Sequence, residues 1–130
     1  MARAKPEKKV RLEYSFGGIK EGSLMYVGTP AVVETYIRSL EHGTTSNIGA
    51  MRKRIARQRR CDGMCPVSTS FFLRTVVEAA MEEIADGAQP SAVTPFWRLI
   101  APDDKIVRKL PVDADWLRAR RDEEGICDGR

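Results

Sequence analysis

The sequence has 130 residues, of which 42% are hydrophobic and 31% are charged, and its formal net charge is +4. These values are typical of one globular domain with its own core, and they exclude a disordered chain or two independent domains. No apolar stretch approaches the ~20 residues of a membrane span, and no apolar signal core follows the basic N-terminus. We therefore expect a cytoplasmic protein without membrane contact, associated with the nucleoid if it is bacterial.

The charge is unevenly distributed along the chain. Residues 1–77 hold 14 Lys and Arg against 6 Asp and Glu, whereas residues 78–130 hold 8 against 12. Residues 52–60 form the densest segment, with six cations in nine residues and no carboxylate among them. Uncompensated like charges repel each other, so this segment favours contact with a polyanion over a role as plain solvated surface.

The first third of the chain predicts a tail, two strands and a helix. Residues 1–20 are expected to be a basic N-terminal tail, flexible over 1–9, with an edge strand at 10–16. A second strand is predicted at 23–27, between glycines. The first helix should follow Thr29 as N-cap, with Pro30 in its first turn, and end at Gly43. Its inner face is expected to hold Val33, Ile37 and Leu40.

A second helix is predicted over residues 47–60, capped from the segment 44–46. Apolar residues at helical spacing, Ile48, Met51 and Ile55, should face inward, and the opposite side should be cationic. Gly63 and Pro66 are expected to end it, with Gly63 in a turn of positive φ.

A third helix is predicted from a cap at Ser68 or Thr69 to about Asp86, and it is the strongest of the set. Its wide apolar stripe, which includes Phe71, predicts a central buried helix. Its first turn is a candidate phosphate-binding site, because unsatisfied N–H groups gather there.

The C-terminal third predicts short elements. Residues 94–100 and 105–110 are expected to form a loop or small hairpin in the position of a wing, followed by a helix over 112–124. Together with the glycine-containing turn between the second and third helices, this predicts a mainly α fold with a small β wing. We expect a winged helix-turn-helix domain over residues 21–126, with a C-terminal tail at 127–130.

Double-stranded DNA is the polyanion that this arrangement favours. Phosphate contacts give affinity without sequence information, and binding should therefore weaken steeply with salt. The residues that we expect to contact DNA are Arg52, Lys53, Arg54, Arg57, Arg60, Ser68, Thr69, Ser70 and Arg74.

The three cysteines give little support for a metal site. Three residues separate Cys61 from Cys65, but a structural zinc ion takes four ligands, and only Cys127 and His42 remain as candidates. We expect reduced thiols, no metal and no cofactor.

The segment Thr94-Pro95-Phe96-Trp97-Arg98 resembles the Pro-Cys-His-Arg-Val segment of alkylguanine-DNA alkyltransferases. The resemblance runs in order over residues 24–126, through the turn at 65–69 to the closing residues 122–126. It is closest to the alkyltransferase-like branch that lacks the active-site cysteine, and it implies a DNA-binding winged-helix domain.

The resemblance also implies that the protein is not an enzyme. Family members transfer an alkyl group to a cysteine activated through a histidine, and here Phe96 and Trp97 occupy those two positions. Alkyltransferase-like proteins bind alkylated DNA without repairing it and signal to other repair factors. By analogy, a modified base would enter an aromatic pocket, and the partner would be a DNA-repair or regulatory protein. The implied pocket residues are Pro95, Phe96, Trp97 and Arg98.

Other interpretations of these residues remain open. Phe96 and Trp97 are equally well explained by core packing, and Arg98 is more simply a residue that fixes the loop by hydrogen bonds. The family's base-extruding arginine and tyrosine have no counterparts, since their positions fall near Ser70 or Phe71 and near Ile48. The alternative function is a regulatory protein-interaction module with an acidic partner surface formed by Asp113, Asp115, Asp122, Glu123 and Glu124.

Overall fold

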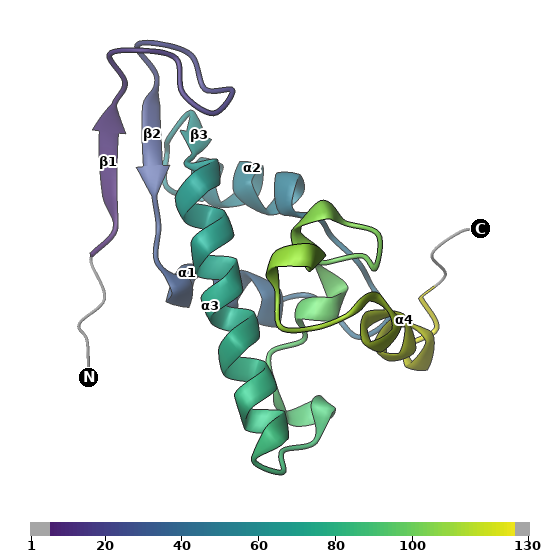
Figure 1. Cartoon of the computed structure of the whole chain (residues 1–130). Helices are drawn as coiled ribbons and strands as arrows, with labels where there is room; N and C mark the ends of the chain where they lie inside the picture. Colours follow the sequence, from purple (N-terminus) through teal and green to yellow (C-terminus); the bar gives the residue numbers. More distant parts are fainter. Residues whose placement is uncertain (1–5, 127–130) are drawn as a thin grey trace.

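The computed structural model describes residues 6–126, and in this part of the chain four α-helices accompany one small sheet (Figure 1). The prediction of a mainly α protein with a small β component is confirmed. The long helix α3 (Pro66–Ala85) runs through the middle, with the sheet beside its N-terminal end and α4 (Ala114–Glu123) on the opposite side of the molecule, beyond the segments that connect the two helices.

The sheet has three strands in the order β1-β2-β3. The central strand β2 (Leu24–Val27) was predicted from its apolar run, and it pairs antiparallel with β1 (Lys8–Arg11) and parallel with β3 (Gly63–Met64). The register places Lys9 opposite Tyr26, and Met25 opposite Gly63. The predicted flexible tail of residues 1–9 therefore extended too far, because β1 begins at Lys8. Residues 1–5 and 127–130 lie outside the described part.

The β1–β2 connection contains a tight two-residue turn. The strand predicted at 10–16 ends early, at Arg11, and Phe16 then pairs with Ile19 across Gly17 and Gly18. Both glycines have positive φ, 57° and 82°, as the turns that fit the twist of a hairpin require.

Helix α1 (Pro30–Arg38) forms where its capping residues predicted it. The Thr29 hydroxyl accepts a hydrogen bond from the Val32 N–H at 3.2 Å, and Val33 and Ile37 are fully buried. The helix ends at Arg38, before the predicted stop at Gly43.

Helix α2 (Ile48–Gln58) has its predicted inner face but different ends. Its N-cap is Asn47, whose side chain accepts from the Ala50 N–H at 2.8 Å, not a residue of 44–46. Beyond Gln58, the residue with positive φ is Arg60 (58°). Gly63 lies in β3 instead of a turn, and a Cβ there would be 2.9 Å from the Ile19 side chain. The missing side chain thus lets Ile19 cover the strand.

Helix α3 begins at Pro66, earlier than predicted, with Cys65 as its N-cap residue. The cap is weak, since the Cys65 sulfur accepts from the Ser68 N–H at 3.5 Å. The middle of the helix is buried as predicted, through Leu73, Val76, Val77 and Ala80. Phe71 was assigned to the buried stripe, and that was wrong: 66% of it is exposed.

The predicted wing does not form. Residues 94–110 contain the 3-10 helices η2 (Phe96–Arg98) and η3 (Lys105–Lys109), preceded by η1 (Pro90–Ala92). The loop interpretation of this region holds, and the hairpin interpretation was wrong. These turns pack beside α4, whose N-cap is Asp113.

Candidate nucleic-acid interface

Four cations on the outer side of α2 and just beyond it are exposed and have no carboxylate partner among residues 6–126. We call them the cationic face; they are Lys53, Arg54, Arg57 and Arg60. Exposed arginines on the other long helices differ: Arg38 pairs with Glu34 at 3.1 Å and Arg74 with Glu78 at 3.0 Å. The absence of carboxylates from α2, evident in the sequence, thus leaves a local positive potential.

Two further cations of this segment hold the fold together. Arg52 was predicted to contact DNA, but its Nε and Nη2 donate to the Met64 carbonyl at 3.0 and 2.6 Å, so it fastens α2 to β3. Arg59 lies over the Tyr26 ring, 5.4 Å from its centroid, and pairs with Glu7 at 3.2 Å. The Tyr26 hydroxyl also donates to Glu7, and together with Arg59 it lowers the pKa of Glu7.

The cationic face borders a hollow of about 600 Å³. Lys53 and Arg57 line it from α2, and Gly17 and Gly18 line it from the β1–β2 connection. Asp62 contributes a carboxylate to the same hollow, but one of its oxygens accepts the Leu24 N–H at 2.8 Å. Segments far apart in the sequence therefore meet beside the exposed cations.

The predicted contacts at the start of α3 separate into exposed and buried residues. Thr69 is 1% exposed and its hydroxyl donates to the Cys65 carbonyl at 2.5 Å, so its assignment to a DNA surface was wrong. Ser68 is half-buried, and its hydroxyl oxygen is buried. Ser70 is exposed, and Arg74 is exposed but paired with Glu78.

The two aromatic residues of the predicted base pocket pack in the core. Phe96 is fully buried and Trp97 is 4% exposed. The Trp116 ring stacks on Phe96, with centroids 5.6 Å apart, and meets Trp97 edge to face at 5.9 Å. Core packing, one of the two interpretations of the aromatic pair, thus accounts for most of their surface.

Glu124, just after α4, gathers the surrounding segments. Its carboxylate accepts hydrogen bonds from Trp97 Nε1 at 2.7 Å, Arg98 Nε at 2.9 Å and the Gly43 N–H at 2.8 Å, and its side chain is 6% exposed. Arg98 also donates to the Leu40 carbonyl at 2.8 Å, which confirms its expected role in fixing the loop. One carboxylate thereby joins η2, α4 and the α1–α2 connection.

These donors set the protonation state of Glu124. Burial by itself raises the pKa of this carboxyl, but the hydrogen bonds from Arg98, Gly43 and Trp97 outweigh burial and bring the pKa to about 2. Glu124 is therefore ionised at neutral pH and stabilises the cluster as a carboxylate.

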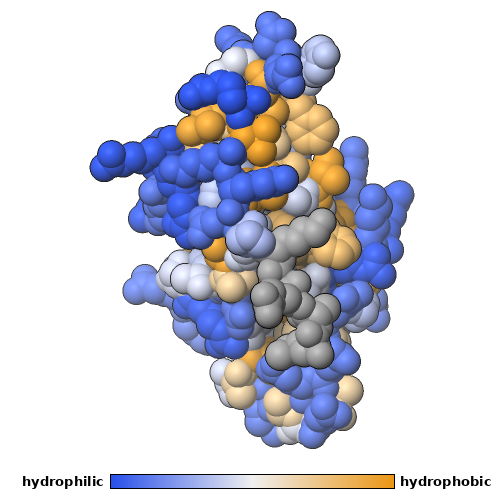
Figure 2. All heavy atoms as spheres, turned by 90° about the vertical axis from the view of Figure 1, so that its left-hand side faces the viewer, coloured by the Kyte–Doolittle hydropathy of each residue, from blue (hydrophilic) through white to orange (hydrophobic). Residues whose placement is uncertain are grey.

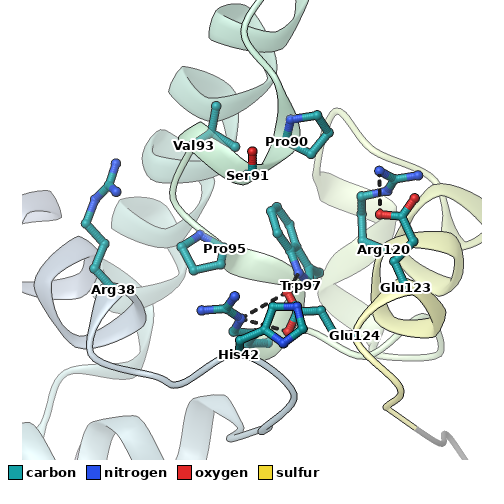
Figure 3. Close-up of a pocket in the computed structure, with 11 residues that line it drawn as sticks. Arg38, His42, Pro90, Ser91, Val93, Pro95, Trp97, Arg120, Glu123 and Glu124 are labelled. Atoms are coloured by element: carbon teal, nitrogen blue, oxygen red, sulfur yellow. Dashed lines mark hydrogen bonds and ion pairs between the residues drawn. The ribbon is translucent and has the colours of Figure 1, made fainter.

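A cavity of about 390 Å³ lies beside this cluster, and Pro95, Trp97 and Arg98 are among its lining residues. Figure 3 shows the Trp97 ring with Pro90 above it, Pro95 to one side, and Glu124 and His42 below it. Carboxylates compensate the charges of two arginines that line this cavity: Arg98 pairs with Glu124, and Arg120 pairs with Glu123 at 2.9 Å. None of the four cations of the cationic face is among the described residues that line it.

The remaining sequence expectations concern thiols, metals and membranes. Cys61 is half-buried and Cys65 buried, both are free thiols, and Cys127 lies outside the described residues. Within residues 6–126, no three or more His, Cys, Asp or Glu side chains are grouped as metal ligands would be. Of the helices described, none combines the length and apolar character that crossing a bilayer demands.

Comparison with family models, with curated proteins and with solved structures finds no match to this chain. The resemblance to alkyltransferase-like proteins accordingly remains a prediction from the residues at 94–98 and their flanks. The geometry of α2 and its neighbours is the basis for a functional proposal.

Proposed function

We propose that this protein is a non-enzymatic DNA-binding protein that contacts the phosphates of double-stranded DNA through the cationic face. The observation that carries the proposal is the exposure of Lys53, Arg54, Arg57 and Arg60 without a carboxylate partner among the described residues. When such cations bind a polyanion, they release its counterions, and no ion pair within the protein has to break first.

The α2–α3 pair supports a helix-turn-helix type of contact. Two helices follow each other through a short connection, and the first turn of the second presents Val67 and Ser70 to solvent. The connection differs from a simple turn, because it contains β3. We therefore base the proposal on the helix pair alone, because residues 94–110 form 3-10 helices where the sequence predicted a wing.

The structure gives less support to lesion sensing than to DNA binding. A base held by stacking needs an accessible ring face, and Phe96 and Trp97 use theirs for each other and for Trp116. The neighbouring cavity has compensated charges and lies apart from the cationic face. We therefore propose duplex binding without selectivity for an alkylated base.

The alternative, a protein-interaction module with an acidic surface, loses its main support. Of the five carboxylates that would form the surface, Glu124 is buried, Asp113 caps α4, and Asp115 and Glu123 each pair with an arginine. Asp113 and Asp122 are exposed and have no arginine partner among the described residues. The acidic surface is therefore neutralised in part, whereas no described carboxylate pairs with the cationic face.

The test is fluorescence anisotropy with a labelled 20-base-pair duplex over a several-fold range of salt. We expect binding that weakens steeply with salt, and a triple variant (Lys53→Gln, Arg57→Gln, Arg60→Gln) with a slope reduced by up to about three. The matched control removes three exposed cations from η3 (Lys105→Gln, Arg108→Gln, Lys109→Gln). No binding at low salt, salt-independent affinity, or an equal loss in the control would overturn the proposal.

A further inference from the structure

Apolar side chains are exposed next to the cationic face. Phe16 is 42% exposed, and Val67 and Phe71, one helical turn apart on α3, are each 66% exposed. We call these three residues the apolar patch. Figure 2 shows hydrophobic atoms among hydrophilic side chains over the upper part of the face that it presents. Large apolar groups exposed together on a small domain indicate a binding surface.

The Gly17-Gly18 turn connects the patch to the cationic face. A Cβ on Gly17 would lie 2.4 Å from Pro66 Cγ, so the turn that follows Phe16 rests on the first turn of α3, next to Val67. On its other side the same turn lines the hollow that Lys53 and Arg57 also line. The turn that follows Phe16 thus touches Pro66, which precedes Val67, and it also lines the hollow of Lys53 and Arg57.

We propose that the apolar patch stacks unpaired bases of single-stranded DNA while the cationic face contacts the phosphates of the same strand. This inference rests on the proposed function and deepens it. Every base has a π-face, and a single strand exposes it, so an exposed aromatic ring beside cations matches both parts of the strand. A continuous duplex keeps its base faces stacked, and it leaves Phe71 without a partner.

The charge beside the patch disfavours a second copy of this chain as the occupant. A symmetric dimer through the patch would bring two cationic faces toward each other, with no described carboxylate on α2 to compensate them. A polyanion with apolar faces would be attracted where a second copy is repelled, because it neutralises these cations while it covers the phenyl rings.

The experiment measures how tightly the whole chain binds a single-stranded 20-mer and the corresponding duplex at one salt concentration. Both probes are labelled with 2-aminopurine. We expect the wild type to favour the single strand and to quench its 2-aminopurine by stacking. Phe71→Ala and Phe71→Leu should weaken single-strand binding on the order of tenfold and leave duplex binding within about twofold, while Phe71→Tyr should retain it. The leucine variant separates ring stacking from apolar area.

The outcomes separate this inference from the proposed function. If duplex binding is salt-dependent and requires the cationic face, but Phe71→Ala affects both probes equally or neither, only the stacking inference fails. Tighter binding of the ribo-oligonucleotide of the same sequence would overturn the assignment to DNA. A concentration-dependent dimer that Phe71→Ala dissociates in sedimentation equilibrium would assign the patch to a second copy and overturn the inference.

Discussion

The indole Nε1 of Trp97 donates a hydrogen bond to Glu124 Oε2 at 2.7 Å, although 27 residues separate them. The bond fixes the Trp97 ring, which the resemblance to alkyltransferases aligns with their activating histidine. It uses the only donor of the indole, so this end of Trp97 is committed to the fold. The motif at 94–98 therefore has a clear structural explanation: it anchors the C-terminal helix to the rest of the domain.

Replacement of Glu124 by Gln should make stability less dependent on pH in acid. The pKa of Glu124 is about 2 in the folded protein against an ordinary value of 4.5. Its contribution, about 3 kcal/mol, is fully present above pH 4.5 and is lost as the pH falls toward 2. Urea unfolding at several pH values should show wild type and Glu124→Gln converging below pH 4.5. A stability difference that stays constant from pH 7 to pH 3 would contradict this role.

Phe96 and Phe71 should respond in opposite ways to truncation. Phe96 is fully buried against Trp97 and Trp116, so Phe96→Ala should cost about 3–5 kcal/mol of unfolding free energy. Phe71 is 66% exposed, and Phe71→Ala should change stability by no more than about 0.5 kcal/mol. Chemical denaturation measures both. Similar losses in the two variants would show that Phe71 is part of the core.

Gly17→Ala should be more destabilising than Gly18→Ala. Both glycines have positive φ, so both variants carry the same kind of backbone strain. Only at Gly17 would the new Cβ also clash with Pro66, whereas nothing lies within 4 Å at Gly18. We expect a difference of about 1 kcal/mol or more in urea unfolding. Equal losses would mean that the turn does not rest on α3.

Arg121→Met should destabilise the packing of α4 on η2. Arg121 is 6% exposed, and its Nη1 donates to the carbonyls of Trp97 at 2.6 Å and Ile100 at 3.3 Å. Loss of these donors leaves buried carbonyls unsatisfied, at a cost of about 2 kcal/mol or more. The control Arg118→Met removes a surface ion pair to Asp115 and should cost less than about 1 kcal/mol. Thermal unfolding of both variants is the measurement, and equal shifts in midpoint would contradict the prediction.

The helices were predictable because their signals are local. Thr29 and Pro30 mark the start of α1, and the spacing of Met51 and Ile55 gives the inner face of α2. Capping groups and apolar periodicity act within one or two turns of chain. The unpaired cations of α2 were predictable for the same reason, since their nearest partners would lie three or four residues away.

The third strand of the sheet and the accessible surface were not predictable in this way. β3 has two residues, too few for a sequence pattern, and it exists because β2 and the α2–α3 connection meet in space. The exposure of Phe71 was missed because periodicity assigns apolar residues to one side of a helix without showing where the neighbouring elements end. The structural role of Arg59 was missed because its ion-pair partner, Glu7, is 52 residues away in the sequence.

The sequence by itself determined the helical elements and the one-sided charge of α2, and it set Phe96 and Trp97 side by side in the motif at 94–98. The tertiary structure decided that those two aromatic residues are buried, that Glu124 holds Trp97, Arg98 and Gly43 together, and that Phe16 and Phe71 remain exposed. Burial and hydrogen-bond partners depend on segments up to 81 residues apart, as in the Gly43–Glu124 bond, and such contacts leave no local pattern in the chain.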